Sequence, residues 1–290
     1  SDLSTDQTGT ICDTYAERFP FIHVTHTANF GASHARNVAL PQCRGEYITF
    51  CDADDYVSSQ LISVLTRAID VFGRPDFLVW HYYNDYELPA EGFPVYDVQG
   101  MSRTEGEFYD GEELCLRILR DNVVGGFTWN KLIRNELAAG FNENLKVLMD
   151  HYWLLELLST HDNVRVCSIN YYLYCYVQTS GIGQTRDPAR IYDEDGLNRF
   201  MLTSEHELDL PSLSPEAYSL IKRNIYSYAL QTLYLRVRVP VPKAYAKLRT
   251  HLRNYAKYYY FTPTIPLWAK VKSIIKHVLV FLHIHKPRQE

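Results

Sequence analysis

The chain has 290 residues and a mass of 33.7 kDa, enough for one large domain or two small ones with a substantial core. Apolar residues make up 46% and charged residues 22% of it, a balance that excludes disordered, collagen-like and coiled-coil proteins. The net charge is −5, but residues 239–290 carry +9 and the rest −14. This asymmetry predicts an acidic body with a basic tail that contacts an anionic surface.

The first 51 residues predict two helices and two strands. Apolar residues every four positions indicate a helix over residues 4–19, and the alternating segment 21–25 predicts a short strand. Residues 29–37 contain a glycine turn that enters a helix ended by Pro41. Residues 46–51 are too apolar for a half-exposed strand, so we expect them at a covered, central position in a sheet.

A helix and a strand follow. The helix begins near Ser58, and its apolar stripe contains Leu61, Leu65, Ala68 and Phe72. Residues 77–83 predict the next strand. The alternation of strands and helices over the first 85 residues predicts an α/β layered sheet with parallel strands. Such sheets bind their ligands at the carboxyl ends of the strands.

The middle of the chain alternates between loop and regular structure. Residues 84–110 lack periodicity and predict a long, functional loop. We expect helices over residues 111–120 and 149–158, and one or two strands over residues 164–177. The remainder is mostly helical, with residues 218–234 as its clearest segment.

Three aspartates, Asp52, Asp54 and Asp55, follow the strand expected over residues 46–51. Clustered carboxylates repel one another unless a cation or protons intervene. Mg²⁺ or Mn²⁺ takes one or two carboxylates and completes its shell with water and substrate phosphates. Asp52 and Asp54 therefore predict a divalent-metal site that holds a nucleotide diphosphate. The alternative is that Asp54 and Asp55 fill a turn and cap the next helix.

Motifs spread over residues 2–180 resemble, in order and spacing, those of family 2 glycosyltransferases. They are Asp2-Leu-Ser-Thr-Asp6, Ile11-Cys-Asp13, Asn29-Phe-Gly-Ala-Ser-His-Ala-Arg-Asn37, Gly45-Glu-Tyr-Ile-Thr-Phe-Cys-Asp-Ala-Asp-Asp55, Thr128-Trp-Asn-Lys-Leu132 and Leu148-Met-Asp-His151. The resemblance implies a GT-A fold, in which helices flank a mixed, mostly parallel sheet. We expect this domain to occupy residues 1–185 and a helical C-terminal region to occupy residues 186–290.

The resemblance also implies roles for five residues. Asp2 matches an aspartate that binds the uracil ring of a UDP-sugar, and Arg36 matches a basic group near the nucleotide. Asp52 and Asp54 match the family's D-x-D, in which the first faces the ribose or a metal-bound water and the second ligates the metal. Asp150 matches the catalytic base. The alternative for Asp150 is a first-turn aspartate favoured by the helix dipole.

The sequence departs from the family pattern at several positions. Leu3, Met149 and Val177 stand where relatives commonly have Gly, Glu and Arg. The family's first two strands and the helix between them would precede Asp2. We therefore expect the chain to be a fragment that lacks roughly 35 to 45 residues, from the length of a βαβ unit.

Residues 266–285 predict a basic amphipathic helix. One half of the helical wheel carries apolar side chains, and the other carries Lys270, Lys272, Ser273, Lys276 and His277. The charge-free stretch is too short to span a bilayer. Trp, Phe and Leu opposite a basic face are typical of an interfacial helix on anionic lipid. The alternative is a helix docked on the protein's own body, with its lysines in solvent.

The resemblance thus implies an inverting hexosyltransferase that uses Mg²⁺ or Mn²⁺ and moves a sugar from a UDP-sugar to a glycan or lipid-linked glycan acceptor. Bacterial surface polysaccharide synthesis is its expected setting. Six cysteines without a C-x-x-C pair predict buried free thiols in a reducing compartment, and hence a cytoplasmic protein. The basic tail and the resemblance to bacterial relatives imply a peripheral position at the inner face of the membrane. The basic residues show no nucleic-acid-reading motif. Two alternatives stay open, namely a non-catalytic nucleotide-sugar-binding module and a peripheral membrane protein that acts through its tail.

Overall fold

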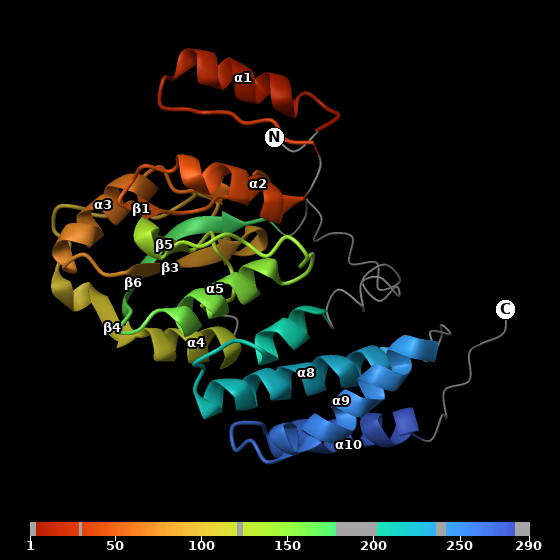
Figure 1. Cartoon of the computed structure of the whole chain (residues 1–290). Coiled ribbons are helices and arrows are strands. Elements are labelled where there is room, and N and C mark those ends of the chain that lie inside the picture. Colours follow the sequence, from red (N-terminus) through yellow and green to blue (C-terminus); the bar gives the residue numbers. More distant parts are fainter. Residues whose placement is uncertain (1–3, 29–30, 121–123, 178–201, 236–241, 282–290) are drawn as a thin grey trace.

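The computed structural model describes residues 4–28, 31–120, 124–177, 202–235 and 242–281. Figure 1 shows a sheet between layers of helices, with long C-terminal helices beyond one layer and the first helix standing apart from the other. The expected α/β class and the helical C-terminal region are confirmed. The expected division at residues 185 and 186 lies outside the described residues.

Within the described residues, six strands form one mixed sheet with the order β1-β5-β3-β6-β2, in which β4 also pairs with β6. The strands are β1 (Tyr47–Ile48), β2 (Tyr56–Val57), β3 (Phe77–Asn84), β4 (Gly106–Asp110), β5 (Lys131–Arg134) and β6 (Arg165–Tyr176). In this part of the chain, parallel pairing is confined to β3 and β6, and the other four pairs are antiparallel.

Helices cover both faces of this sheet and build the C-terminal region. The α-helices are α1 (Thr8–Arg18), α2 (Ala32–Ala39), α3 (Leu61–Val71), α4 (Gly111–Arg120), α5 (Met149–Thr160), α8 (Pro215–Leu235), α9 (Pro242–Tyr260) and α10 (Leu267–Phe281). Short 3₁₀ turns are Leu40–Gln42, Asp85–Glu87, Arg103–Glu105 and Asn135–Leu137. As far as the chain is described, none of its helices is both long and apolar enough to cross a bilayer.

The sheet is buried on both faces because successive residues of β3 pack into different cores. Phe77 and Val79 belong to the core shared with α4, α5 and α8, whereas Leu78 and Trp80 belong to the core shared with α3. This arrangement explains the uninterrupted apolar run of β3. The predicted apolar stripe of α3 is confirmed, since its members are all buried: Leu61, Leu65, Ala68 and Phe72.

The N-terminal predictions are partly wrong. Residues 21–25 form no strand, and only residue 27 makes an isolated bridge, because none of the described strands runs beside this segment to pair with it. β1 lies at one end of the strand order rather than at its centre, since its partner is β5 alone among the strands described. α1 forms as expected but has no buried residue.

The cysteine prediction is right in one part and wrong in another. All six thiols are free. Three of them are buried in the core, and two on the loops that flank β1 are exposed; the buried ones are Cys115, Cys167 and Cys175, and the exposed ones are Cys43 and Cys51. Exposure follows from their places on connecting segments rather than within the packed strands.

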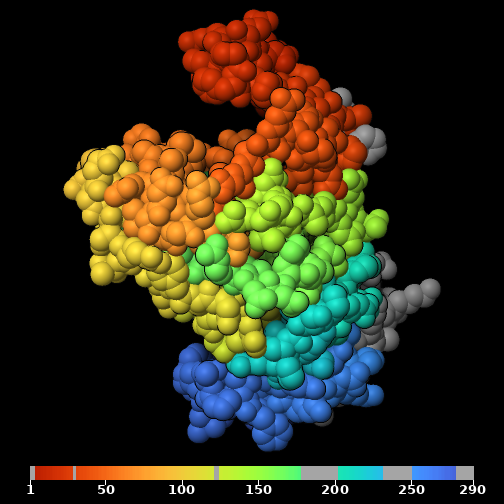
Figure 2. Space-filling model, turned by 60° about the vertical axis from the view of Figure 1, so that its left-hand side comes forward, coloured from red at the N-terminus to blue at the C-terminus, as the bar shows by residue number. Residues whose placement is uncertain are grey.

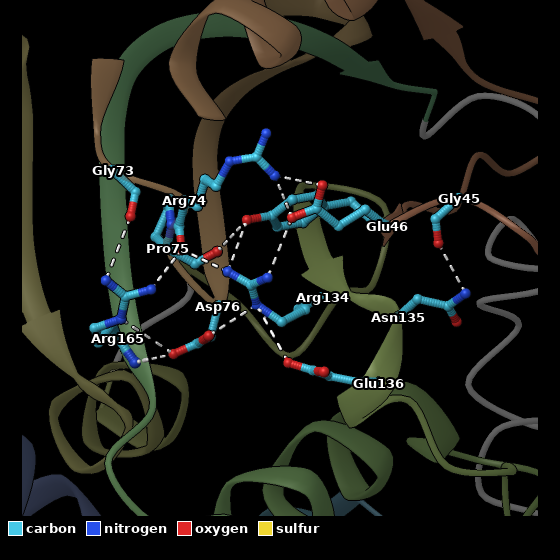
Figure 3. A network of polar contacts seen from close by, with 11 residues as sticks. Gly45, Glu46, Gly73, Arg74, Pro75, Asp76, Arg134, Asn135, Glu136 and Arg165 are labelled. Atoms are coloured by element: carbon cyan, nitrogen blue, oxygen red, sulfur yellow. Dashed lines mark hydrogen bonds and ion pairs between the residues drawn. The ribbon is translucent and has the colours of Figure 1, made fainter. Parts of the chain in front are cut away.

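A polar network joins the amino ends of β1, β3 and β6 to the end of β5 (Figure 3). Asp76 lies at its centre, because its Oδ1 accepts a hydrogen bond from Arg134 Nε at 3.0 Å and its Oδ2 accepts one from the Arg165 backbone N–H at 2.8 Å. Arg134 also donates to the carbonyl oxygen of Arg74 at 2.6 Å. The side chains of Asp76 and Arg134 are only 19% and 16% exposed, whereas Glu46, which lies 3.2 Å from Arg134 Nη1, is 46% exposed. Asp76 is therefore the most buried carboxylate that compensates the charge of Arg134.

We expect the substitution Asp76→Ala to lower the free energy of unfolding by about 2–4 kcal/mol, because it removes the most buried carboxylate partner of Arg134 and leaves the Arg165 backbone N–H without its acceptor. Urea denaturation measures this change. Glu136→Ala is the matched control, since Glu136 is 74% exposed and lies 3.6 Å from the same Arg134 Nε. Its expected cost is below about 0.5 kcal/mol. Equal losses in the two variants would contradict a central role for Asp76.

Candidate active site

Three of the predicted site residues, Arg36, Asp52 and Asp150, meet in one charged cluster. Arg36 extends from α2, Asp52 follows β1, and Asp150 lies in the first turn of α5. Arg36 Nη2 donates to Asp52 Oδ1 at 3.2 Å, and Arg36 Nη1 donates to Asp150 Oδ1. One guanidinium therefore joins two carboxylates that lie almost a hundred positions apart in the sequence.

Aromatic rings hold the Arg36 guanidinium in place. Its central carbon lies 5.6 Å from the centre of the Phe50 ring and 5.2 Å from the centre of the Phe141 ring. Such cation–π contacts stabilise a cation that is largely withdrawn from water, and the Arg36 side chain is only 16% exposed. Arg36 is thus positioned by packing as well as by its ion pairs.

The Asp150 carboxylate is oriented by two donors. In addition to Arg36 at Oδ1, Thr128 Oγ1 donates to Asp150 Oδ2 at 3.1 Å. Leu148, just before α5, adopts a left-handed conformation with φ 55°, which turns the chain so that the helix starts beside the cluster. Each carboxylate oxygen can accept a second hydrogen bond, so Asp150 keeps capacity for a further hydroxyl.

The acidic loop contains one structural aspartate, Asp55, and one exposed aspartate, Asp54. Asp55 accepts hydrogen bonds from the Tyr174 hydroxyl at 2.6 Å and from the Val177 backbone N–H at 2.8 Å, which ties the loop to β6. Asp55 therefore has a structural role, as the turn-filling alternative expected, but its side chain contacts Tyr174 and Val177 rather than capping α3. Asp54 is exposed at the loop surface.

The charge on this loop favours a cation. Burial raises the pKa of Asp52, and the neighbouring charges of Asp150, Asp55 and Asp54 raise it further, against the opposing effect of Arg36. No group of three or more His, Cys, Asp or Glu side chains in the described part of the chain is arranged to hold a metal. The carboxylate oxygens of Asp52 and Asp54 are hard donors of the kind that Mg²⁺ and Mn²⁺ prefer, and substrate phosphate would have to complete the coordination shell.

Behind Asp150 lies a buried lysine that the sequence reasoning did not single out. Lys131 is fully buried, and its Nζ donates to the carbonyl oxygens of Val124, Gly125 and Phe127 at 3.1, 3.0 and 2.7 Å. Asn130 Oδ1 lies 2.7 Å from the same Nζ, so four oxygens share the three N–H groups of the ammonium. Burial lowers the pKa of Lys131 to about 7, against the raising effect of Asp150. A lysine within the motif Thr128-Trp-Asn-Lys-Leu132, directly before the apolar residues 132–133, was the available signal.

A cavity of about 580 Å³ opens beside Asp150 between α4, α5 and α8. Phe127 and Met149 provide part of its apolar lining, and Arg223 from α8 provides a positive charge. Glu207, which also lines it, lies 3.0 Å from His151 Nδ1. Sequence reasoning missed Glu207 and Arg223 because the helical region has no motif that marks them.

The remaining predictions concern residues near this cluster. Asp2, predicted to contact the uracil ring, lies outside the described residues. Met149, which stands where relatives have Glu, accepts a hydrogen bond at Sδ from Ser33 Oγ at 3.1 Å and so links α5 to α2. Trp129 is buried and stacks on Tyr174 with ring centres 4.4 Å apart, which is a core position beside the site.

Residues 1–139 match the family model described as Glycosyl transferase family 2. Among curated proteins, glycosyltransferase GlyG of Streptococcus pneumoniae is 29% identical over 196 residues, which cover 62% of this chain and 60% of GlyG. The uncharacterized glycosyltransferase EpsJ of Bacillus subtilis is 47% identical over 178 residues, which cover 60% of this chain and 50% of EpsJ. The chain thus spans between half and three fifths of the length of these relatives.

A third relative is similar in both sequence and structure. Poly(ribitol-phosphate) beta-N-acetylglucosaminyltransferase TarS of Staphylococcus aureus is 36% identical over 200 residues, which cover 67% of this chain and 32% of TarS. The match to the crystal structure of S. aureus TarS 1–349 in complex with UDP covers 96% of this chain and 78% of the TarS chain, with a TM-score of 0.56 and 18% identity. This likeness shows the expected GT-A fold.

The family model, the curated relatives and the shared fold lead to one conclusion: residues 1–139 of the chain form a family 2 glycosyltransferase domain.

Proposed function

We propose that the chain transfers a sugar from a UDP-sugar to a hydroxyl of a glycan acceptor, with inversion, in the synthesis of a bacterial surface polymer. The observation that carries this proposal is the cluster of Asp52, Arg36 and Asp150 beside a cavity of about 580 Å³. The cluster combines groups suited to a pyrophosphate with a carboxylate suited to a hydroxyl. The name of the TarS relative and the UDP in its crystal structure support the same class of donor and acceptor.

The donor's pyrophosphate would bind at Arg36 and the acidic loop. Arg36 offers a planar fork of N–H donors that matches phosphate oxygens. Asp54 and Asp52 would hold Mg²⁺ or Mn²⁺, which when bound neutralises the charge that develops on the leaving diphosphate. Arg36 now lies between two carboxylates, so phosphate binding would draw it away from at least one of them.

Asp150 would act as the base that takes the proton from the acceptor hydroxyl. A base must lie within about 3 Å of the proton that it removes. Thr128 and Arg36 fix the carboxylate at the mouth of the cavity, where an acceptor hydroxyl can approach it. A single displacement at the anomeric carbon then inverts its configuration, because the hydroxyl attacks from the side opposite the diphosphate.

The cavity beside Asp150 would receive the acceptor. Its volume lies in the range of sites that enclose small ligands. The aromatic ring of Phe127 offers a flat apolar surface to a sugar ring, and Arg223 offers hydrogen-bond donors. The acceptor would therefore be a glycan with an anionic or strongly polar group near the reacting hydroxyl.

Incubation with UDP-sugars and Mn²⁺, followed by mass spectrometry of the products, tests whether the chain turns over its donor. The proposal expects slow hydrolysis of a UDP-sugar in the absence of acceptor, with release of UDP. Binding of UDP without any turnover, under conditions where a relative is active, would favour the non-catalytic module instead.

The substitution Asp54→Asn is expected to weaken UDP binding at least tenfold in Mn²⁺ and to leave binding unchanged in EDTA, since a neutral amide is a poor metal ligand. Isothermal titration with and without Mn²⁺ measures both values. Asp70→Asn, at an exposed aspartate of α3, serves as the control and should bind UDP like the unmodified chain. Unchanged Mn²⁺-dependent binding in Asp54→Asn would remove this residue from the metal site.

A further inference from the structure

α10 packs on the protein through its polar side. Its Ser273 is only 5% exposed, and His277 Nδ1 lies 2.9 Å from the hydroxyl of Tyr226 on α8. Tyr260 of α9 donates to Ser273 Oγ at 3.5 Å. The docked alternative of the sequence analysis is therefore right about docking, but the helix faces the body with the side that was expected in solvent.

The apolar side of α10 consequently faces outward. Six large apolar side chains, here named the outer face, are between 47% and 76% exposed: Leu267, Trp268, Val271, Ile274, Ile275 and Val278. They recur at spacings of three and four residues, so they form one continuous stripe along the helix. α10 lies at the end of the molecule opposite α1 (Figures 1 and 2), which leaves the stripe at an outer surface.

The charged side chains of α10, and of α9 beside it in the chain, all have one sign. On a helical wheel Lys270 and Lys272 lie about 100° to either side of the centre of the stripe. α9 and α10 together contain eight lysine and arginine residues and no acidic residue. Lysines that flank an apolar stripe can keep their ammonium groups in water while their stems lie along an apolar surface.

We propose that the outer face of α10 binds an anionic lipid surface, with its apolar side chains inserted between headgroups and its lysines against phosphates. The polarity pattern and the charge match what such a surface offers. A second copy of the chain is a poorer partner, because a symmetric contact would bring Lys270 and Lys272 of both copies together. The proposal is independent of sugar transfer, since lipid binding needs neither donor nor metal.

Trp268 provides a direct spectroscopic test. It is 69% exposed, whereas Trp80, Trp129 and Trp153 are at most 2% exposed, so a change in tryptophan emission on lipid binding reports on Trp268. With vesicles of phosphatidylglycerol and phosphatidylcholine, the full chain should sediment, its emission should shift to the blue, and brominated lipids should quench it. Vesicles of phosphatidylcholine alone, or high salt, should reduce binding at least tenfold.

The double substitution Ile274→Ser and Ile275→Ser is expected to weaken vesicle binding at least tenfold, as is the charge reversal Lys270→Glu with Lys272→Glu. Ile62→Ser is the matched control, since Ile62 is 68% exposed on α3, and it should bind like the unmodified chain. Should the serine variant not fold, quenching of the unmodified chain by brominated lipid still decides the matter.

Three results would overturn the proposal. One is an unmodified chain that stays in the supernatant with anionic vesicles. Another is a Trp268 emission that is already blue-shifted in a lipid-free monomer, which would mean that the chain itself covers the stripe. The third is a lipid-free dimer in sedimentation velocity whose formation shifts the emission, which would assign the outer face to a second copy. UDP binding should persist in all variants, which separates this proposal from that of sugar transfer.

Discussion

The substitution Asp150→Asn is expected to lower kcat for sugar transfer by about 10²- to 10⁴-fold, because an amide cannot take the proton of the acceptor hydroxyl. The shape of the side chain is preserved, and Arg36 keeps its contact with Asp52, so the affinity for UDP should change by less than about twofold. Initial rates of UDP release give kcat, and isothermal titration gives the UDP Kd.

Asp110→Asn is the matched control for Asp150→Asn. Asp110 also lies at the start of a helix, where its Oδ1 accepts a hydrogen bond from the backbone N–H of Glu113 at 2.8 Å, but it is outside the cluster. If Asp150 served only to favour its helix start, both variants would lose a little stability and neither would lose turnover. Full activity in Asp150→Asn would withdraw the assigned role of the base.

The substitution Lys131→Met is expected to lower the free energy of unfolding by about 3–5 kcal/mol, because it removes the Nζ donor from the buried carbonyl oxygens of Gly125 and Phe127 and from the Asn130 amide oxygen. The Val124 carbonyl oxygen also loses this donor but keeps its hydrogen bond from Asn130 Nδ2. Phe127 lines the cavity, and Gly125 directly precedes Gly126, which also lines it. We therefore expect the affinity for the acceptor to fall as well. Lys257→Met, at an exposed lysine, should change stability by less than about 0.5 kcal/mol.

The pH dependence of this difference follows from the pKa of Lys131, which burial lowers to about 7 from the ordinary lysine value of 10.5. Between these two values the unfolded chain binds more protons than the folded one, so stability rises with pH. Relative to Lys131→Met, the unmodified chain should gain up to about 1.4 kcal/mol per pH unit between about pH 7 and pH 10. Urea denaturation across this range measures the slope, and a flat or falling difference would mean that the lysine stays charged in its ring of oxygens.

The regular elements were predictable where one periodicity dominates the local sequence. α3 has a 3.6-residue apolar stripe, and the apolar run of β3 reflects burial on both faces, so both elements formed where the pattern placed them. Residues 21–25 alternate as a strand does, yet they form none, since a strand needs a neighbour for its backbone groups and local sequence does not state whether one is present.

The charged cluster was foreseen through motifs rather than through geometry. Arg36, Asp52 and Asp150 each belong to a segment that resembles a family motif, but only folding places one guanidinium between two carboxylates. Lys131 and Arg223 carried weaker signals, because the importance of Lys131 comes from its burial and that of Arg223 from the cavity that it borders. Neither property is visible in a list of neighbouring residues.

By itself the sequence determined the α/β order of elements, the family-like motifs and the two-sided character of the C-terminal helix, because each of these depends on residue types at short spacings. Tertiary structure alone decided which strands pair, which charges meet and which side of α10 faces outward. These outcomes depend on the partners available to each surface. The polar side of α10 faces inward, where His277 contacts the hydroxyl of Tyr226, a residue far away in the chain.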